Sequence, residues 1–327
     1  MSKLSMSKAI REAIYEEMLR DENVIVMGED MGRMGNPFGI TEGFLDKFGP
    51  DRVVETPICE SGFTGMAVGA AMRGIRPVVE LMYVDFIGVA MDPVMNQAAK
   101  MRYMTGGQVN IPMVVRAPMG AGRRNAGQHS QCLETLFTHI PGLKVVSPST
   151  PADAKGLLKS AIRDEDPVIF LEHKTLYAIK DEVPEEEHII PLGEADVKRE
   201  GKDVTIIAWS RQVLFALEAA KELEKDGIDA EVLDLRTLVP LDWEAIKKSV
   251  CKTHNVVIVQ EGYRRSGYAG EIATQIMEEL FDELDSPVER VAGLNTVPPF
   301  SPPLEDAFFP NSNDIVKAVK KVVNFKL

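Results

Sequence analysis

Short apolar runs alternate with helical patterns along most of the chain. A helical stripe formed by Ile10, Ile14 and Met18 comes first, and the continuous apolar run 24–27 follows it. Apolar runs separated by helices are typical of a parallel sheet covered on both faces, so the pattern predicts an α/β fold. Further strands are expected at 53–54, 77–82, 113–116, 144–147 and 168–172, with helices at 61–74, 86–104 and 151–163.

The alternation is interrupted at residues 181–203, where Pro, Gly and acidic residues are concentrated. Such a composition favours a surface linker. Because a second alternation follows, we predict two domains, 1–180 and 204–327, each with a mainly parallel sheet flanked by helices. Strands of the second domain are expected at 204–208, 231–235 and 256–259, and helices at 211–225, 242–252 and 269–283.

Composition and charge exclude several classes of function. With 327 residues, 45% of them hydrophobic, the chain can form two cores without a metal or a disulfide. Its net charge of −13 argues against nucleic acid and against an anionic membrane surface, since both attract an excess of Lys and Arg. Cys59, Cys132 and Cys251 lack CxxC spacing and the N-terminus has no apolar signal segment, so we expect reduced thiols in a cytoplasmic protein.

Common motifs of nucleotide-binding and metal enzymes are missing. The sequence has no GxxxxGKS/T, HExxH or CxxC, and its five histidines show no ligand spacing. Gly120, Gly122 and Gly127 follow a predicted strand but do not form G-x-G-x-x-G. The next strand ends at Ser147 and Pro148 rather than at an acid. We therefore expect no nicotinamide dinucleotide site.

Three strand-to-helix junctions of the first domain carry side chains suited to a ligand site. Glu60 begins a helix with a small, apolar face, Met82 and Phe86 follow the next strand, and a glycine-rich loop with an arginine pair ends at His129. Ligands of α/β sheets bind outside the carboxyl ends of strands, and a carboxyl group in apolar surroundings keeps a proton that can reach a cofactor nitrogen. Ordinary structural roles stay open as well: a helix-capping acid, core packing, a structural histidine and a solvated arginine pair.

Several segments together resemble the β subunit of the decarboxylating component of 2-oxo acid dehydrogenase complexes. In the first domain they are TPICESGFTGMAVGAAMRGIRPVVELMYVDF, DPVMNQAAKMRYMTGG, IPMVVRAPMGAG followed by GQHSQ, and IPGLKVVSPSTPADAKGLLKSAIRDEDPV. In the second they are VLDLRTLVPLD, VVIVQEG and VPPFSPPLED. The resemblance covers nearly the whole chain. It implies a transketolase-like pyrimidine-binding domain followed by a transketolase C-terminal-like domain, and ELMYVDFIG favours the acetoin dehydrogenase branch over the pyruvate branch.

The resemblance also implies roles for single residues. Glu60 stands where the family has the glutamate that hydrogen-bonds N1′ of the aminopyrimidine of thiamine diphosphate. Met82 and Phe86 match the residues that line and stack on that ring. His129 matches the histidine expected to move protons and to assist acyl transfer to a lipoyl group, and Glu29 matches an acid of an interior polar channel.

Some relatives bind a structural potassium ion through backbone carbonyls. The matching positions in this chain are Met113, Ala161, Ile162, Asp164 and Asp166. Carbonyl ligation leaves no side-chain pattern, so this set rests on the resemblance, and Asp166 stands where some relatives have asparagine.

The cofactor site in this chain is expected to be incomplete. Enzymes of this cofactor class usually hold the diphosphate and Mg²⁺ with a GDG motif followed by an asparagine, and no GDG occurs here. An α subunit is therefore predicted to hold that end of thiamine diphosphate. The resemblance implies an α₂β₂ heterotetramer that docks on a dihydrolipoyl acyltransferase core.

The expected activity is cleavage of acetoin or pyruvate with transfer of the acetyl unit to lipoamide. A branched-chain 2-oxo acid dehydrogenase subunit is the alternative of the same class, because substrate choice depends largely on the α subunit. A non-catalytic docking subunit and a single-chain transketolase-like enzyme are further alternatives. The presence of Glu60 and His129 argues against the first of these, and the missing diphosphate motif against the second.

Overall fold

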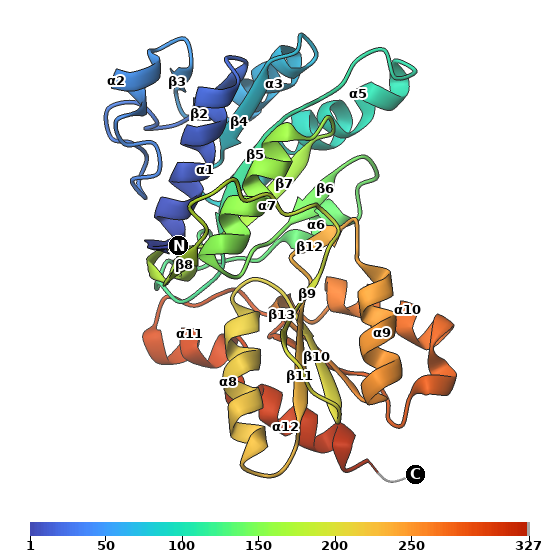
Figure 1. Ribbon diagram of the computed structural model, residues 1–327. Coiled ribbons are helices and arrows are strands. Elements are labelled where there is room, and N and C mark those ends of the chain that lie inside the picture. The colour runs from blue at the N-terminus through green and yellow to red at the C-terminus, as the bar shows by residue number, and fades with distance from the viewer. Residues whose placement is uncertain (326–327) are drawn as a thin grey trace. The chain divides into compact units, whose positions relative to one another are not determined.

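The structure, a computed structural model, describes residues 1–325 (Figure 1). These residues form two compact units. The first consists of Met1–Met119 and Leu136–Leu192, and the second of Gly120–Thr135 together with the chain from Gly193 onward. The segment Gly120–Thr135, which contains His129, therefore packs with the second unit although it follows a strand of the first.

The first unit is built on a parallel sheet. Its strands lie in the order β6-β7-β5-β4-β2-β3, and each of these neighbours pairs in parallel. The strands consist almost wholly of buried residues because helices cover both faces. A separate antiparallel pair joins β1 (Ser2–Ser5) to β8 (Lys180–Val183). The strand bounds are β2 (Val24–Gly28), β3 (Val53–Glu55), β4 (Arg76–Glu80), β5 (Val114–Met119), β6 (Lys144–Val146) and β7 (Val168–His173).

Local sequence signals explain where the helices of this unit begin. In α7 (Pro151–Arg163), the Thr150 hydroxyl accepts a hydrogen bond from the backbone N–H of Asp153, and proline occupies the first turn, where its missing N–H costs nothing. Helix α7 packs on α1 (Met6–Arg20), and charged side chains join the two. The remaining helical segments are α2 (Phe44–Phe48), α3 (Glu60–Ala71), η1 (Val84–Phe86), α4 (Ile87–Asp92), η2 (Pro93–Ala98), α5 (Ala99–Met104) and η3 (Lys174–Ala178).

The single helix expected at 86–104 has a break in its hydrogen-bond pattern. It consists of α4, the π-helical segment η2 and α5. Pro93 stands at the first residue of η2, where it has no backbone N–H to donate and its ring displaces the preceding turn. The proline therefore accounts for the change of helix type within an otherwise apolar pattern.

The second unit has its own sheet, in the order β14-β13-β10-β11-β9. The pairs β14–β13, β13–β10 and β10–β11 are parallel, and β9 adds an antiparallel edge strand. Strand β9 lies inside the segment that the sequence predicted as a linker. The bounds are β9 (Asp196–Arg199), β10 (Val204–Ala208), α8 (Gln212–Glu224), β11 (Ala230–Asp234), β12 (Thr237–Val239), α9 (Trp243–Thr253), β13 (Val256–Tyr263), α10 (Tyr268–Glu279), η4 (Phe281–Glu283), β14 (Glu289–Gly293), α11 (Pro302–Phe308) and α12 (Ser312–Val323).

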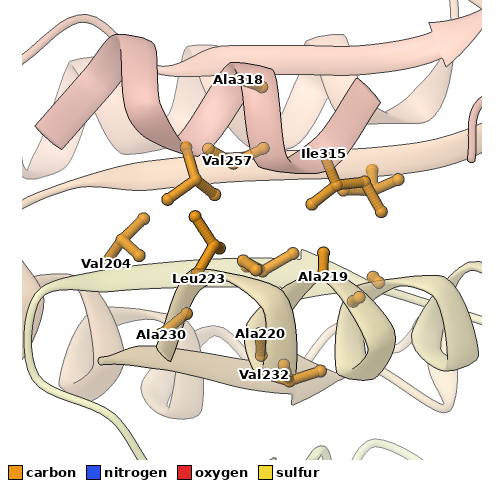
Figure 2. Close-up of a cluster of buried hydrophobic side chains, with 14 of the residues drawn as sticks. Val204, Ala219, Ala220, Leu223, Ala230, Val232, Val257, Ile315 and Ala318 are labelled. Atoms are coloured by element: carbon orange, nitrogen blue, oxygen red, sulfur yellow. The ribbon is translucent and has the colours of Figure 1, made fainter. Parts of the chain in front are cut away.

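Helices α8 and α12 cover one face of this sheet. Figure 2 shows the side chains of both helices directed into one apolar layer. The alanines of α8, among them Ala219 and Ala220, let the helix backbone approach the strands closely. Leu223 and Ile315 are fully buried, so truncating either to alanine is expected to cost about 2–5 kcal/mol.

The predicted fold class is confirmed. Two units, each with a mainly parallel sheet flanked by helices, occur in the order that the hydrophobic pattern indicated. Among residues 1–325, no helix combines the length and the apolar character needed to span a bilayer.

Candidate active site

Glu60 is the first residue of α3 and lies just beyond the carboxyl end of β3. The residue is 8% exposed. The N-cap residue, Cys59, contributes no side-chain hydrogen bond to the helix. The next turn of α3 is uncharged and buries Phe63 and Thr64. Glu60 is thus a largely buried carboxyl group at the positive end of an apolar helix.

Glu29 extends from the carboxyl end of the neighbouring strand, β2. The ends of β2 and β3 are joined because the Thr56 N–H donates to the Gly28 carbonyl over 3.0 Å. Burial, and next the negative charge of Glu60, raise the pKa of Glu29 above its ordinary value. The oxygen Oε1 of Glu29 and the hydroxyl of Thr56 are both buried and without a hydrogen-bond partner within residues 1–325. Two interacting carboxyl groups and an available hydroxyl therefore gather at the carboxyl edge of the sheet.

Met82 and Phe86 lie in the segment that follows β4. Both are half-buried, and Phe86 ends the short helix η1. The ring of Phe86 packs edge-on against Tyr83 at 6.1 Å between centroids, and Tyr83 packs edge-on against Phe38 at 6.3 Å. Strand β4 pairs with β2 on one side and with β5 on the other. The segment therefore places an apolar, aromatic surface near the middle of the sheet's carboxyl edge.

A buried charged cluster that the sequence analysis did not identify lies on β4, β5 and β7. Arg116 is fully buried and donates to Glu80 over 2.7 Å and to both oxygens of Glu172 over 2.7 and 2.8 Å. The Tyr177 hydroxyl donates to Glu172 over 2.6 Å. Burial raises the pKa of Glu80 even though Arg116 opposes this effect. In the sequence, the only sign of this cluster is that three of the predicted apolar strands each contain a single charged residue.

This cluster also fixes the loop that follows Glu29. The amide nitrogen of Asn36 donates to both oxygens of Glu80, over 2.9 and 2.7 Å. The Asn36 amide oxygen accepts from the backbone N–H groups of Phe38 and Ile40. Asn36 adopts a φ of 64°, a conformation that asparagine tolerates better than most residues. The charged cluster therefore determines the path of the chain beside the candidate site.

His129 is half-buried and belongs to the second unit, whereas Glu60, Glu29, Met82 and Phe86 belong to the first. Its loop closes on itself, because the Gly120 N–H donates to the Gln131 carbonyl over 3.0 Å.

The two arginines of this loop, whose role the sequence left open, lie in different environments. Arg123 is exposed, but Arg124 forms ion pairs with Glu305 and Asp306 at 2.5 and 2.7 Å. The carboxylates of α11, far along the chain, neutralise the guanidinium, which the local sequence could not reveal.

Glu134, the first residue of α6 (Glu134–Thr138), is a second group that the sequence analysis missed. It is 1% exposed, and its Oε2 has no hydrogen-bond partner in the described part of the chain. Burial, together with the charge of Glu261, raises the pKa of Glu134 to about 7. A carboxyl group that keeps its proton near neutral pH therefore lies a few residues after His129.

Four of the five residues expected to bind potassium have another partner for their carbonyl oxygen. The Met113 carbonyl accepts from the Val168 N–H over 2.9 Å. The carbonyls of Ile162 and Asp164 converge on the guanidinium of Arg76, at 3.2 and 3.0 Å. Ala161 accepts from the Asp164 N–H, and the Asp166 carboxylate pairs with Arg102 and Lys144. Each carbonyl has a second lone pair, so the potassium site stays a prediction.

Both units match known protein families. Residues 2–180 match the transketolase pyrimidine-binding domain, and residues 193–315 match the transketolase C-terminal domain. A solved structure described as a split-gene transketolase, an inactive β₄ tetramer, is similar over 99% of both chains, with a TM-score of 0.82 and 26% identity.

Curated relatives align with the chain over almost its full length. The β subunit of the acetoin:2,6-dichlorophenolindophenol oxidoreductase of Cupriavidus necator is 50% identical over 98% of both chains. The pyruvate dehydrogenase E1 component subunit β of Rickettsia felis is 48% identical over 99% of both. The 2-oxoisovalerate dehydrogenase subunit β of Bacillus subtilis is 47% identical over 99% of this chain and 100% of that one. The chain therefore belongs to the family of E1 β subunits of pyruvate, acetoin and 2-oxoisovalerate dehydrogenases, built from transketolase-type pyrimidine-binding and C-terminal domains.

Proposed function

We propose that this chain supplies the pyrimidine half of a thiamine diphosphate site in an enzyme that cleaves acetoin or pyruvate and transfers the acetyl unit to lipoamide. The observation that carries the proposal is the buried carboxyl group of Glu60 at the start of an apolar helix, next to the electrostatically coupled Glu29. Family membership agrees with it.

Glu60 fits the chemistry that the cofactor's pyrimidine ring requires. Its carboxyl group is largely buried at the start of an apolar helix, so a ring nitrogen placed there would meet a directional hydrogen-bonding group with little competition from water. We assign to Glu60 the hydrogen bond to ring nitrogen N1′, and thereby the control of a proton at that atom. Thiamine diphosphate, when bound, supplies the electron sink for carbon–carbon cleavage.

The surrounding residues are assigned supporting roles. Met82 and Phe86 would form the apolar surface against which the ring packs, which also keeps water away from Glu60. The buried Oε1 of Glu29, which has no hydrogen-bond partner among residues 1–325, is available to a ligand or a partner chain, in keeping with a place in an interior polar channel. His129 is assigned to proton transfer during acyl transfer to the lipoyl group.

A partner subunit is part of the proposal. The sequence lacks the GDG motif that usually binds the diphosphate and Mg²⁺, so an α subunit would hold that end of the cofactor in an α₂β₂ heterotetramer. The heterotetramer would dock on a dihydrolipoyl acyltransferase core in the cytoplasm. A potassium ion at Met113, Ala161, Ile162, Asp164 and Asp166 belongs to the same proposal.

The candidate substrates are those for which three similar β subunits are named. The identities of 50%, 48% and 47% to β subunits named for acetoin, pyruvate and 2-oxoisovalerate differ too little to separate them. A branched-chain 2-oxo acid dehydrogenase subunit is therefore the second candidate function. The motif ELMYVDFIG favours acetoin.

The test is reconstitution of this chain with an α chain that carries GDG. Acetoin, pyruvate and 2-oxoisovalerate are offered in turn, with 2,6-dichlorophenolindophenol as electron acceptor. We expect turnover with acetoin or pyruvate, and its loss in the Glu60→Gln variant without loss of assembly. Asp51→Asn, an exposed carboxylate-to-amide change near β3, is the matched control and should retain activity. Full activity of Glu60→Gln would refute the assignment of Glu60.

A further inference from the structure

The loop of residues 120–131, called here the His129 loop, is held at both ends. Its ends meet through the hydrogen bond from the Gly120 N–H to the Gln131 carbonyl. The Tyr263 hydroxyl donates to the Gln131 side-chain oxygen over 3.3 Å. Within the loop the His129 N–H donates to the Ala126 carbonyl over 3.3 Å. A closed loop with these contacts has a defined backbone path, so the position of His129 depends on whatever fixes the rest of the loop.

Glu305 of α11 binds the backbone of this loop directly. Its carboxylate is fully buried and accepts from the N–H groups of Gly122 over 3.0 Å and of Arg124 over 3.3 Å. The φ angles of these two residues are +100° and +59°. A left-handed backbone of this kind turns nearby N–H groups toward one side and forms a concave site for an anion. The carboxylate of Glu305 occupies that site.

The Arg124 side chain completes the enclosure of Glu305. Its guanidinium donates to Glu305 over 2.5 Å and to the Pro302 carbonyl over 3.1 Å. A buried carboxylate is stable only when hydrogen bonds and opposite charge compensate its lost hydration. For Glu305 the loop supplies that compensation, so the carboxylate and the loop stabilise each other's position.

Neighbouring contacts hold the start of the loop in the same place. The Ala121 N–H donates to Glu261 over 2.8 Å, and Arg211 donates to the Ala121 carbonyl over 3.3 Å. The guanidinium of Arg211 also lies 4.5 Å from the centre of the Phe309 ring, just after α11. Ala121 packs against Phe309 and Phe308 in a small apolar cluster. These contacts belong to one unit and connect α11, the start of α8 and the loop.

We propose that Glu305 is a positioning residue for His129, acting through the backbone of residues 122–124; the inference rests on the proposed role of His129 in acyl transfer. Glu305 is not assigned a contact with substrate or cofactor. It fixes the loop so that the imidazole meets the incoming lipoyl group in one orientation.

The first test compares two reactions of the reconstituted α–β enzyme. In the proposed function, acylation of a lipoyl domain depends on His129, whereas reduction of the dye does not use that step. Glu305→Gln removes the charge and nearly keeps the size, and we expect it to lower the kcat of lipoyl acylation about tenfold or more, as misplacement of a catalytic group does. Dye reduction should change less than twofold. Glu305→Asp, which keeps the charge on a shorter side chain, should lose less.

Asp306→Asn is the matched control on the same helix. Asp306 pairs with the same guanidinium at 2.7 Å, but its side chain is 59% exposed. It should leave both rates within twofold of the unchanged enzyme. The proposal is overturned if Glu305→Gln retains full acylation or if it slows both reactions equally.

A double-mutant comparison separates positioning from a general effect. If Glu305 acts through His129, then Glu305→Gln should add little to the loss caused by His129→Ala, because the two changes remove one function. If the double variant loses acylation activity by the product of the two single losses, the proposal is overturned.

A third readout does not depend on activity. Arg123 is exposed, and trypsin cleavage after Arg123 or Arg124 reports on the loop. In the intact chain, Glu305→Gln should speed this cleavage several-fold, and Asp306→Asn should not. Unchanged cleavage in Glu305→Gln would contradict the structural part of the proposal. Two results together would separate this inference from the proposed function. If Glu305→Gln speeds cleavage but His129→Ala leaves acylation unchanged, the proposed role of His129 is wrong, whereas the contact between Glu305 and the loop is supported.

Discussion

The Glu60 site and the His129 loop place their key side chains by different means. Only residues 56–59 separate the end of a strand from Glu60, the first residue of a helix, so the parallel sheet sets its position within a few residues. His129 lies in a loop whose backbone is bound by Glu261 and Glu305, which are 140 and 183 residues distant in sequence from their loop partners. The first arrangement is local and the second depends on distant carboxylates. Changes far from the site should therefore affect the His129 loop and spare the Glu60 site.

The largest effect is expected from removing the two key side chains themselves. Glu60→Gln should lower both dye reduction and lipoyl acylation, by about 10²–10⁴-fold, the usual contribution of a group that controls a proton. His129→Ala should lower acylation alone. Steady-state rates with the dye and with a lipoyl domain distinguish the two patterns. If His129→Ala slowed dye reduction and lipoyl acylation equally, the Glu60 site and the His129 loop would not have separate roles.

A large stability effect is expected at the charged cluster beside the Glu60 site. Arg116→Met leaves Glu80 and Glu172 buried without their cation, which should destabilise the chain by about 3–5 kcal/mol. Arg102→Met removes only the half-exposed pair with Asp166, and should cost about 1 kcal/mol or less. Urea unfolding of the full chain measures both. If the two variants lost the same free energy of unfolding, the role assigned to the cluster would be wrong.

A pH-dependent effect is expected near the His129 loop. Burial raises the pKa of Glu134 from 4.5 to about 7, so between these pH values the folded chain holds a proton that the unfolded chain has released. Stability therefore falls as pH rises through this range. Above pH 7, burying the charged form costs about 3 kcal/mol.

Glu134→Gln removes that cost. Relative to the unchanged chain, the variant should gain about 2–3 kcal/mol of stability between pH 5 and pH 8. Urea unfolding at the two pH values checks this. A stability difference that does not vary with pH would show that Glu134 is ionised in the folded chain.

The smallest effect is expected at Gly127. A Cβ at this position would lie 2.4 Å from Cγ1 of Val297, the end of a side chain that is 69% exposed and able to move. Gly127→Ala should therefore cost about 1 kcal/mol or less and loosen the His129 loop slightly, as measured by trypsin cleavage after Arg123. If Gly127→Ala speeds trypsin cleavage as much as Glu305→Gln does, the contact of Gly127 with Val297 would hold the loop instead of Glu305.

The sequence predicted those parts of the molecule that depend on neighbouring residues. Apolar runs and helical stripes define the strands and helices, and their alternation implies the parallel sheets. The carboxyl edge of the first sheet then follows, with Glu60, Met82 and Phe86 at strand ends. The family resemblance added roles that periodicity alone does not contain.

Features that depend on distant pairing could not be predicted. Nothing near Arg124 indicates that its partner is Glu305, and nothing near Arg116 indicates two buried carboxylates. Strand β9 reads as a linker because its sequence, Asp196–Arg199, is mostly charged, as is common for an edge strand. A proline within a helical pattern, Pro93, signals a disturbance without specifying a π-helical segment.

We propose that this chain holds only the pyrimidine end of thiamine diphosphate. Titration calorimetry of the cofactor with Mg²⁺ tests it most directly, on the isolated chain and on the chain assembled with a GDG-bearing α subunit. We expect tight cofactor binding and turnover only for the assembled α and β chains. Tight binding and turnover by the isolated chain would contradict it.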